Sequence, residues 1–258
     1  MKPASEKIKS LIDENGNGSV SGRSDLPIPA PIVYTQTRTA AVTPAVLRER
    51  RIVATFESGP FSDAYKILRT QVMQRMRENG WNLLGVTSPG AGEGKTLTAV
   101  NLAVSLGMEA SQTVLLVDAD LRKPGLHAAF GLEAGPGLID YLLDQVPLPD
   151  LLIHPGIQRL VLLPGGRPVT RSSELLTSSP MRALVGELKH RYASRMVVFD
   201  LPPLLNAADV LAFSPLIDAL LLVVEAGRTQ VEEVERSLAL LSAVPIVGTV
   251  LNKGERNS

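Results

Sequence analysis

The stretch that decides the fold is Thr87-Ser88-Pro89-Gly90-Ala91-Gly92-Glu93-Gly94-Lys95-Thr96. It follows the apolar run Leu83-Leu84-Gly85-Val86, which predicts a buried strand, and it precedes residues 97–106, which predict an apolar helix. A glycine-rich turn between a strand and a helix that closes in Gly-Lys-Thr is typical of the phosphate-binding loop. Its backbone N–H groups surround a phosphate, and the helix N-terminus adds its dipole.

The residues of this loop predict how a nucleotide is held. Lys95 can reach the β- and γ-phosphates, and the Thr96 hydroxyl can ligate Mg²⁺. Pro89 departs from the common pattern, because it takes the place of the first glycine. The flanking strand and helix still favour a nucleotide site over a glycine-rich turn without a ligand. The loop residues expected to contact the nucleotide are Gly90, Ala91, Gly92, Glu93, Gly94, Lys95, Thr96 and Leu97.

Aspartates follow two further apolar runs. Residues 113–117 predict a strand that ends at Asp118 and Asp120, and residues 196–199 predict a strand that ends at Asp200. Because the carboxyl ends of parallel strands meet at one edge of a sheet, we expect these carboxylates beside the phosphate loop. Phosphoryl transfer needs a phosphate cradle, a metal ion, and carboxylates that hold the metal or orient the nucleophile.

These side chains have expected roles. The candidate catalytic residues are Lys95, Asp118, Asp120 and Asp200, and the candidate Mg²⁺ ligands are Thr96, Asp118 and Asp200. Asp200 suits the Walker B position, and Asp118 is placed to accept a proton from an attacking hydroxyl or to join the water shell of the metal. Arg122 and Lys123 would offset phosphate charge. A single strand-end aspartate also fits a helix cap or a turn, so the prediction rests on the carboxylates together behind a phosphate loop.

Apolar runs alternate with helical periodicities along the chain. This predicts an α/β fold with a mainly parallel sheet covered by helices on both faces. Further strands are expected at 159–163, 219–224 and 246–251, and helices at 62–79, 172–176, 179–192, 206–213 and 229–243, the last capped by Thr229. Residues 51–56 fit a short strand or an extended lead-in. Residues 1–50, rich in Ser, Pro, Ala, Thr and Gly, predict a flexible arm before a domain at 51–258.

The composition excludes several classes of protein. The 26 basic and 26 acidic residues give a formal net charge of zero, so no overall field attracts nucleic acid or anionic lipid. The absence of cysteine excludes disulfides, a thiolate metal site and a cysteine nucleophile. The N-terminus leads into no apolar signal core, and no apolar run is long enough to span a bilayer. A cytoplasmic protein is therefore expected.

Three segments resemble the motifs of a known family. Residues 88–96, Val117-Asp118-Ala119-Asp120-Leu121-Arg122-Lys123-Pro124 and Phe199-Asp200-Leu201-Pro202-Pro203 resemble the Walker A, Walker A′ and Walker B motifs of bacterial tyrosine kinases. These are the CpsD/CapB-type kinases of capsule and exopolysaccharide export. The resemblance covers residues 60–254 and implies the MinD/ParA-like branch of P-loop proteins. It also implies that Arg122 and Asn252 complete the nucleotide contacts.

The resemblance implies an ATP- and Mg²⁺-dependent protein-tyrosine kinase that regulates exopolysaccharide or capsule synthesis. The family works with a membrane-spanning polysaccharide co-polymerase, so a separate activator that recruits this chain to the inner face of the cytoplasmic membrane is implied. The family's ring-forming helix carries Glu-x-x-Arg-x-x-Arg, and Asp63, Lys66 and Arg69 match its charges. A homo-oligomeric ring through the helix at 62–79 is therefore implied, against a plainer interpretation as ion pairs on a solvated face.

Two features leave alternatives open. The chain closes with Lys253-Gly254-Glu255-Arg256-Asn257-Ser258, without the tyrosine cluster that autokinases of the family phosphorylate, and only Tyr34 falls in the expected arm. The acceptor is therefore Tyr34, another protein, or water, and water would make the chain an ATP-driven switch for an export complex. A DNA-partitioning ATPase is disfavoured by the zero net charge and by Gly90, where that branch carries a signature lysine.

Overall fold

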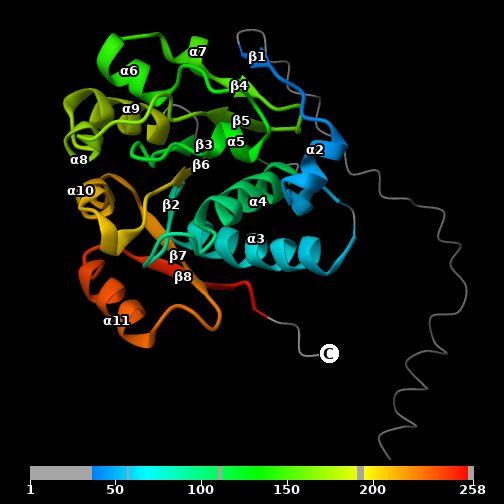
Figure 1. Ribbon diagram of the computed structural model, residues 1–258, viewed down its shortest axis with the longest axis vertical. Helices are drawn as coiled ribbons and strands as arrows, with labels where there is room; N and C mark the ends of the chain where they lie inside the picture. Colours follow the sequence, from blue (N-terminus) through cyan, green and yellow to red (C-terminus); the bar gives the residue numbers. More distant parts are fainter. Residues whose placement is uncertain (1–36, 57, 110–111, 191–194, 255–258) are drawn as a thin grey trace, which may run out of the picture. The chain divides into compact units, whose positions relative to one another are not determined.

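The computed structural model describes residues 37–56, 58–109, 112–190 and 195–254, and these residues build one mixed sheet with helices on both faces (Figure 1). The strand order is β1-β4-β5-β3-β6-β2-β7-β8. All neighbouring strands pair in parallel except β4 and β5, which are antiparallel. The strands are β1 (Arg38–Thr39), β2 (Leu83–Thr87), β3 (Thr113–Asp118), β4 (Ile153–His154), β5 (Leu160–Leu163), β6 (Arg195–Asp200), β7 (Ala219–Glu225) and β8 (Ile246–Asn252).

Successive residues of the central strands serve opposite faces of the sheet. Leu84 and Leu116 join one apolar cluster, whereas Leu83 and Leu115 join the other, and none of the four is more than 1% exposed. Both faces must therefore be apolar, which explains why the strands appear in the sequence as uninterrupted apolar runs. The predicted fold class is confirmed.

The helices divide between the two clusters. Those on the first face are α2 (Pro44–Glu49), α3 (Pro60–Glu78), α4 (Lys95–Gly107) and α5 (Leu126–Ala129), with the 3-10 turn η1 (Val53–Thr55). Those on the second face are α6 (Leu138–Asp144), α7 (Leu148–Leu151), α8 (Ser172–Leu176), α9 (Ser179–His190), α10 (Asp209–Phe213) and α11 (Val231–Leu240), with η2 (Leu204–Asn206) and η3 (Ser214–Leu216). Figure 1 shows α3 lying alongside α4.

Three local predictions were wrong in detail. Residues 51–56 were expected to form a short strand or an extended lead-in, but they contain the 3-10 turn η1, because Asn101 of α4 binds the backbone of this segment. The helix expected from residue 206 begins at Asp209, after η2. The helix expected from Thr229 begins at Val231 with Gln230 as its cap, because the Thr229 hydroxyl bonds to groups outside the helix.

The folded part of the chain also begins before residue 51. Residues 37–50 were predicted to belong to a flexible arm, but β1 pairs with β4, and α2 places Leu47, 7% exposed, in the first cluster. The Thr43 hydroxyl accepts a hydrogen bond from the N–H of Val46, and Pro44 opens the helix, which is a start signal present in the sequence. The rest of the predicted arm, residues 1–36, lies outside the described residues.

Asn101 provides a test of this packing. It is fully buried; its Oδ1 accepts a hydrogen bond from the N–H of Ala54 (3.0 Å), and its Nδ2 donates to the carbonyls of Arg51 (3.1 Å) and Leu97 (3.0 Å). Asn101→Ala leaves these backbone groups buried without hydrogen-bond partners. We therefore expect the free energy of unfolding in urea to fall by about 2 kcal/mol. The exposed Gln74→Ala should change it by less than about 0.5 kcal/mol. Equal values for the two variants would contradict this assignment.

Candidate nucleotide and phosphoryl-transfer site

The loop between β2 and α4 has the geometry of a phosphate cradle. Gly92 and Gly94 have φ angles of 83° and 94°, in the region that favours glycine. A Cβ on Gly94 would lie 2.0 Å from Nδ2 of Asn252, so only glycine fits there. Pro89 has no positive φ, so its position does not require glycine, and its carbonyl accepts a hydrogen bond from the N–H of Leu205 (3.1 Å). The loop leads into the N-terminus of α4, where an anion is favoured.

Glu93 holds the loop together from inside. Its side chain is 3% exposed, and its Oε2 accepts a hydrogen bond from the N–H of Gly90 at 2.9 Å. Its Oε1 accepts one from the hydroxyl of Thr229, while the Ser88 hydroxyl donates to the Gly90 carbonyl at 2.7 Å. The Glu93 side chain therefore shapes the cradle, and only its backbone remains for the nucleotide contact expected of it.

The ends of β7 and β8 hold the same loop from outside. Nδ2 of Asn252 donates to the carbonyl of Glu93 (2.9 Å), and Nζ of Lys253 donates to the carbonyl of Gly92 (2.8 Å). Lys253 also pairs with Glu225 at 2.9 Å. The side-chain amide of Asn252, which was expected at the nucleotide, thus lies directly against the backbone of the cradle.

Lys95 and three carboxylates meet beside the loop. The β3–β6 register places Asp118 opposite Asp200. Nζ of Lys95 donates to Oδ2 of Asp120 at 2.8 Å and lies 3.7 Å from Oδ1 of Asp200. Burial opposes the charge of Lys95, but Asp200 and Asp120 outweigh burial and raise the pKa of its ammonium group. The structure therefore brings together the four residues predicted to be catalytic.

Asp200 has the features of a metal ligand. Its side chain is 1% exposed, and neither carboxylate oxygen makes a well-formed hydrogen bond, although Thr96 and Lys95 lie close enough to oppose the rise of its pKa. Burial raises its pKa, opposed by the charge of Lys95. The hydroxyl of Thr96 is close by, 3.4 Å from Nζ of Lys95. No group of three or more carboxylate or imidazole side chains in the described part of the chain is arranged to hold one metal ion by itself, so a Mg²⁺ ion here would complete its shell with phosphate and water oxygens.

Asp118 supports the backbone as well as facing the site. Its Oδ2 accepts hydrogen bonds from the N–H groups of Gly125 and Leu126, both at 2.9 Å, at the start of α5. Burial, with the nearby charge of Asp200, raises its pKa to about 7. A carboxylate that titrates near neutral pH suits proton transfer, and its hydrogen bonds fix where it points. The Asp118 side chain therefore binds the start of α5, as the capping interpretation expects, and also lies beside Asp200, as the catalytic interpretation expects.

Arg122 is placed differently from its expected role. Its Nε donates to Oδ2 of Asp209, a fully buried carboxylate on α10, at 3.1 Å. It still borders a cavity of about 270 Å³ beside the cradle. The cavity is lined by Ala91, Gly92, Lys95, Asp120, Arg122, Lys123, Pro202, Pro203, Asn206 and Ala207. Four of the predicted contacts, Ala91, Gly92, Lys95 and Arg122, belong to this lining. The other six lie outside it: Gly90, Glu93, Gly94, Thr96, Leu97 and Asn252.

Two functional side chains were missed by reasoning from the sequence. Thr229 was expected to cap a helix, and the internal role of the Glu93 side chain was not foreseen. The signal for Thr229 was present, because it follows the end of β7 at the same edge of the sheet as the cradle.

Comparisons with known proteins fit this geometry. The chain is 32% identical over 207 residues to the tyrosine-protein kinase YwqD of Bacillus subtilis (strain 168), covering 79% of this chain and 86% of YwqD. It is 31% identical over 216 residues to the succinoglycan biosynthesis transport protein ExoP of Rhizobium meliloti (strain 1021), covering 81% of this chain but 27% of ExoP. No family model matches the chain.

Solved structures give the same result for the fold. The chimerical protein CapA2B2 superimposes with a TM-score of 0.75 and 28% identity, covering 85% of this chain and 94% of that one. The septum site-determining protein MinD of Pyrococcus horikoshii OT3, solved with Mg-ADP, gives a TM-score of 0.55 at 22% identity, with 67% and 71% covered. The fold and the cradle define a P-loop protein of the MinD-like class. Within that class, the identity to YwqD shows that the chain belongs to the family of bacterial tyrosine kinases.

The raised pKa of Asp118 predicts a pH effect on the metal-free, nucleotide-free protein. Between the ordinary value of 3.8 and about 7, the folded state holds a proton that the unfolded state releases, so stability falls as pH rises. In EDTA, we expect the wild-type protein to lose about 2 kcal/mol more than Asp118→Asn between pH 5 and pH 8. Chemical denaturation at each pH measures this.

The control for this prediction is Asp150→Asn, which removes an exposed carboxylate from α7 and should follow the wild-type protein. Equal pH dependence in the wild-type protein and Asp118→Asn would show that Asp118 titrates normally.

Proposed function

We propose that this chain is an ATP-dependent protein-tyrosine kinase that acts in exopolysaccharide or capsule synthesis. The observation that carries the proposal is the buried meeting of Lys95 with Asp118, Asp120 and Asp200 beside a phosphate cradle. Family membership supports tyrosine as the acceptor, and ExoP, named for succinoglycan biosynthesis, supports the pathway.

The side chains divide the work of phosphoryl transfer. The amides of residues 90–96 and the α4 N-terminus would hold the phosphates of ATP, and Lys95 would leave Asp120 to bind the β- and γ-phosphates. Thr96 and Asp200 would hold Mg²⁺, which when bound neutralises charge on the transferred group. The phenolic oxygen forms a bond to the γ-phosphorus, the bond to the β–γ bridging oxygen breaks, and ADP departs.

Asp118 supplies the destination for the phenolic proton. It lies opposite Asp200 on the neighbouring strand, and its carboxylate is oriented by the backbone of α5. Its place in the water shell of the metal is the other role consistent with this position. Both roles require the carboxylate, so Asp118→Asn should slow transfer more than it weakens ATP binding.

Purified protein with Mg-ATP tests the proposal. We expect phosphotyrosine, on this chain or on an added acceptor protein, to form at least 100-fold more slowly in Lys95→Met and Asp200→Asn, because each removes charge stabilisation at the reacting centre. Mass spectrometry locates the modified residue, and Asp150→Asn serves as the control. Mg-ATP turnover without any phosphotyrosine would contradict the kinase assignment and leave an ATP-driven switch.

A membrane partner forms part of the proposal. None of the helices in the described ranges has both the length and the apolar composition needed to cross a bilayer. The chain matches 27% of ExoP, a transport protein, and the solved CapA2B2 is a chimera. These relatives support recruitment of this chain to the inner face of the cytoplasmic membrane by a separate, membrane-spanning polysaccharide co-polymerase.

Self-association through α3 is the last element of the proposal. Asp63 and Lys66 form an exposed ion pair at 2.9 Å, as the plainer interpretation predicts, and Arg69 turns inward to donate to the carbonyl of Ser105 at 3.1 Å. The support for an interface comes from two large apolar side chains on α3, Phe61 at 67% and Ile67 at 61% exposure.

Ile67→Asp tests this interface. A charge in the centre of an apolar contact should dissociate the assembly, so light scattering after size exclusion with Mg-ATP should show a lower mass. Leu143→Asp, which changes an apolar side chain on α6 with 47% exposure, should leave the mass unchanged. A wild-type monomer at every concentration would rule out the ring.

A further inference from the structure

A second cleft opens beside the nucleotide cavity. It has a volume of about 600 Å³ and shares Arg122 and Lys123 with that cavity. Its remaining lining residues are Pro124, His127, Ala134, Gly135, Gly166, Arg167 and Pro168. Because the two hollows share a border, a molecule in the second cleft lies next to the phosphates bound in the first.

The walls of this cleft are held in place by hydrogen bonds. One wall is formed by the segment that comes after β3 in the chain. In this segment, the N–H groups of Gly125 and Leu126 donate to the carboxylate of Asp118. The other wall is formed by the segment that comes after β5. In this segment, the N–H of Val169 donates to the carbonyl of Leu121 at 2.9 Å. The cleft is therefore preformed, and one of its walls is attached to a carboxylate of the phosphoryl-transfer site.

The charged groups that face the cleft are basic. Arg122 is paired with Asp209, and Arg167 is paired with Asp140 (2.8 Å) and Asp144 (3.0 Å). In contrast, the side chains of Lys123 and His127 make no hydrogen bond or ion pair with any described residue. No acidic residue lines the cleft. Carboxylates of a bound molecule would supply the missing partners.

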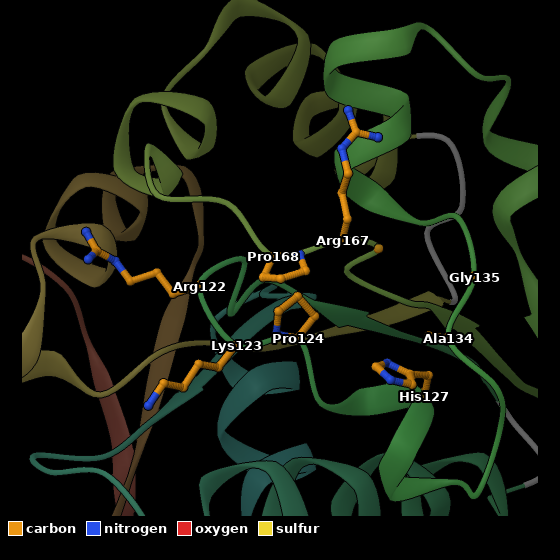
Figure 2. A pocket seen from close by; sticks show the side chains of 9 residues that line it. Arg122, Lys123, Pro124, His127, Ala134, Gly135, Arg167 and Pro168 are labelled. Atoms are coloured by element: carbon orange, nitrogen blue, oxygen red, sulfur yellow. The ribbon is translucent and has the colours of Figure 1, made fainter.

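The space between these groups is apolar and flat. In the view of Figure 2, the rings of Pro124 and Pro168 lie next to each other, with Arg122 and Lys123 on one side and His127 on the other. Ala134, Gly135 and Gly166 add no bulk. An aromatic ring can lie against proline rings, as in the grooves that bind proline-rich segments, where the roles are exchanged.

We propose that this cleft binds the acceptor segment, a peptide in which acidic residues flank the reactive tyrosine. The ring of the tyrosine lies on Pro124 and Pro168, and the flanking carboxylates pair with Lys123 and His127. This inference rests on the proposed kinase function and adds a substrate preference to it. Tyr34 has no carboxylate among residues 30–38, so it is a poor acceptor in its native sequence.

Peptide binding tests the cleft without relying on catalysis. Three fluorescent peptides are compared by anisotropy at 150 mM salt with saturating Mg-ADP. The first has the sequence of residues 30–38, the second has Ile32, Val33, Thr35 and Gln36 all replaced by Glu, and the third is the second with Tyr34→Ala. We expect the second peptide to bind at least tenfold more tightly than each of the others.

Variants then assign the binding to the cleft. His127→Glu should lower the affinity for the acidic peptide at least fivefold, and His127→Ala should lower it less. Both variants should keep the wild-type affinity for Mg-ADP, which serves as a check on folding. His190→Glu, at the exposed end of α9, should behave as the wild-type protein. Equal affinities for the first and second peptides, or no effect of His127→Glu, would overturn the inference.

The kinase proposal and the cleft can fail separately. Tight, His127-dependent binding of the acidic peptide with no phosphate transfer to it would support the cleft and count against the kinase. If phosphate is transferred to the first and second peptides at equal rates, and both bind with equal affinity, the kinase proposal is supported and the inference about the cleft is overturned.

Discussion

The site depends on a shortage of positive charge in a buried space. Lys95 is the ammonium group that faces Asp118, Asp120 and Asp200, and the side chains of Lys95, Asp120 and Asp200 are 12%, 7% and 1% exposed. Burial disfavours the charged form of Asp118, and the charge of Asp200 beside it adds to this effect, so the pKa of Asp118 rises to about 7. A proton on Asp118 and a divalent cation at Asp200 are alternative ways of correcting the same imbalance.

The architecture creates this shortage and also tolerates it. Parallel strands β3 and β6 place Asp118 and Asp200 in register, so the backbone pairing alone is enough to bring these two residues side by side. The cradle on the other side of Lys95 is made rigid by the side chains of Glu93, Thr229 and Asn252, which form hydrogen bonds with polar groups of the loop. Pre-organisation of this kind removes the cost of rearrangement when a nucleotide binds.

Much of this arrangement is predictable from the sequence, for physical reasons. The central strands are buried on both faces, so their apolar runs are unambiguous, and the rule that ligands bind at the carboxyl ends of parallel strands locates the site. Long-range side-chain partners are not predictable in this way. The hydroxyl of Thr229 binds Glu93, 136 residues away, and Arg122 binds Asp209, 87 residues away. Helix α2 was missed because it is short and contributes one buried side chain, Leu47, to the core.

The contact between Lys95 and Asp120 has a consequence for selectivity. Asp120 engages this lysine at 2.8 Å in a region of low solvent exposure. A ligand gains this lysine only by displacing a carboxylate, so it must present more negative charge at that point than one aspartate does. Competition with this ion pair therefore favours ligands that carry a chain of phosphates over singly charged anions of similar size.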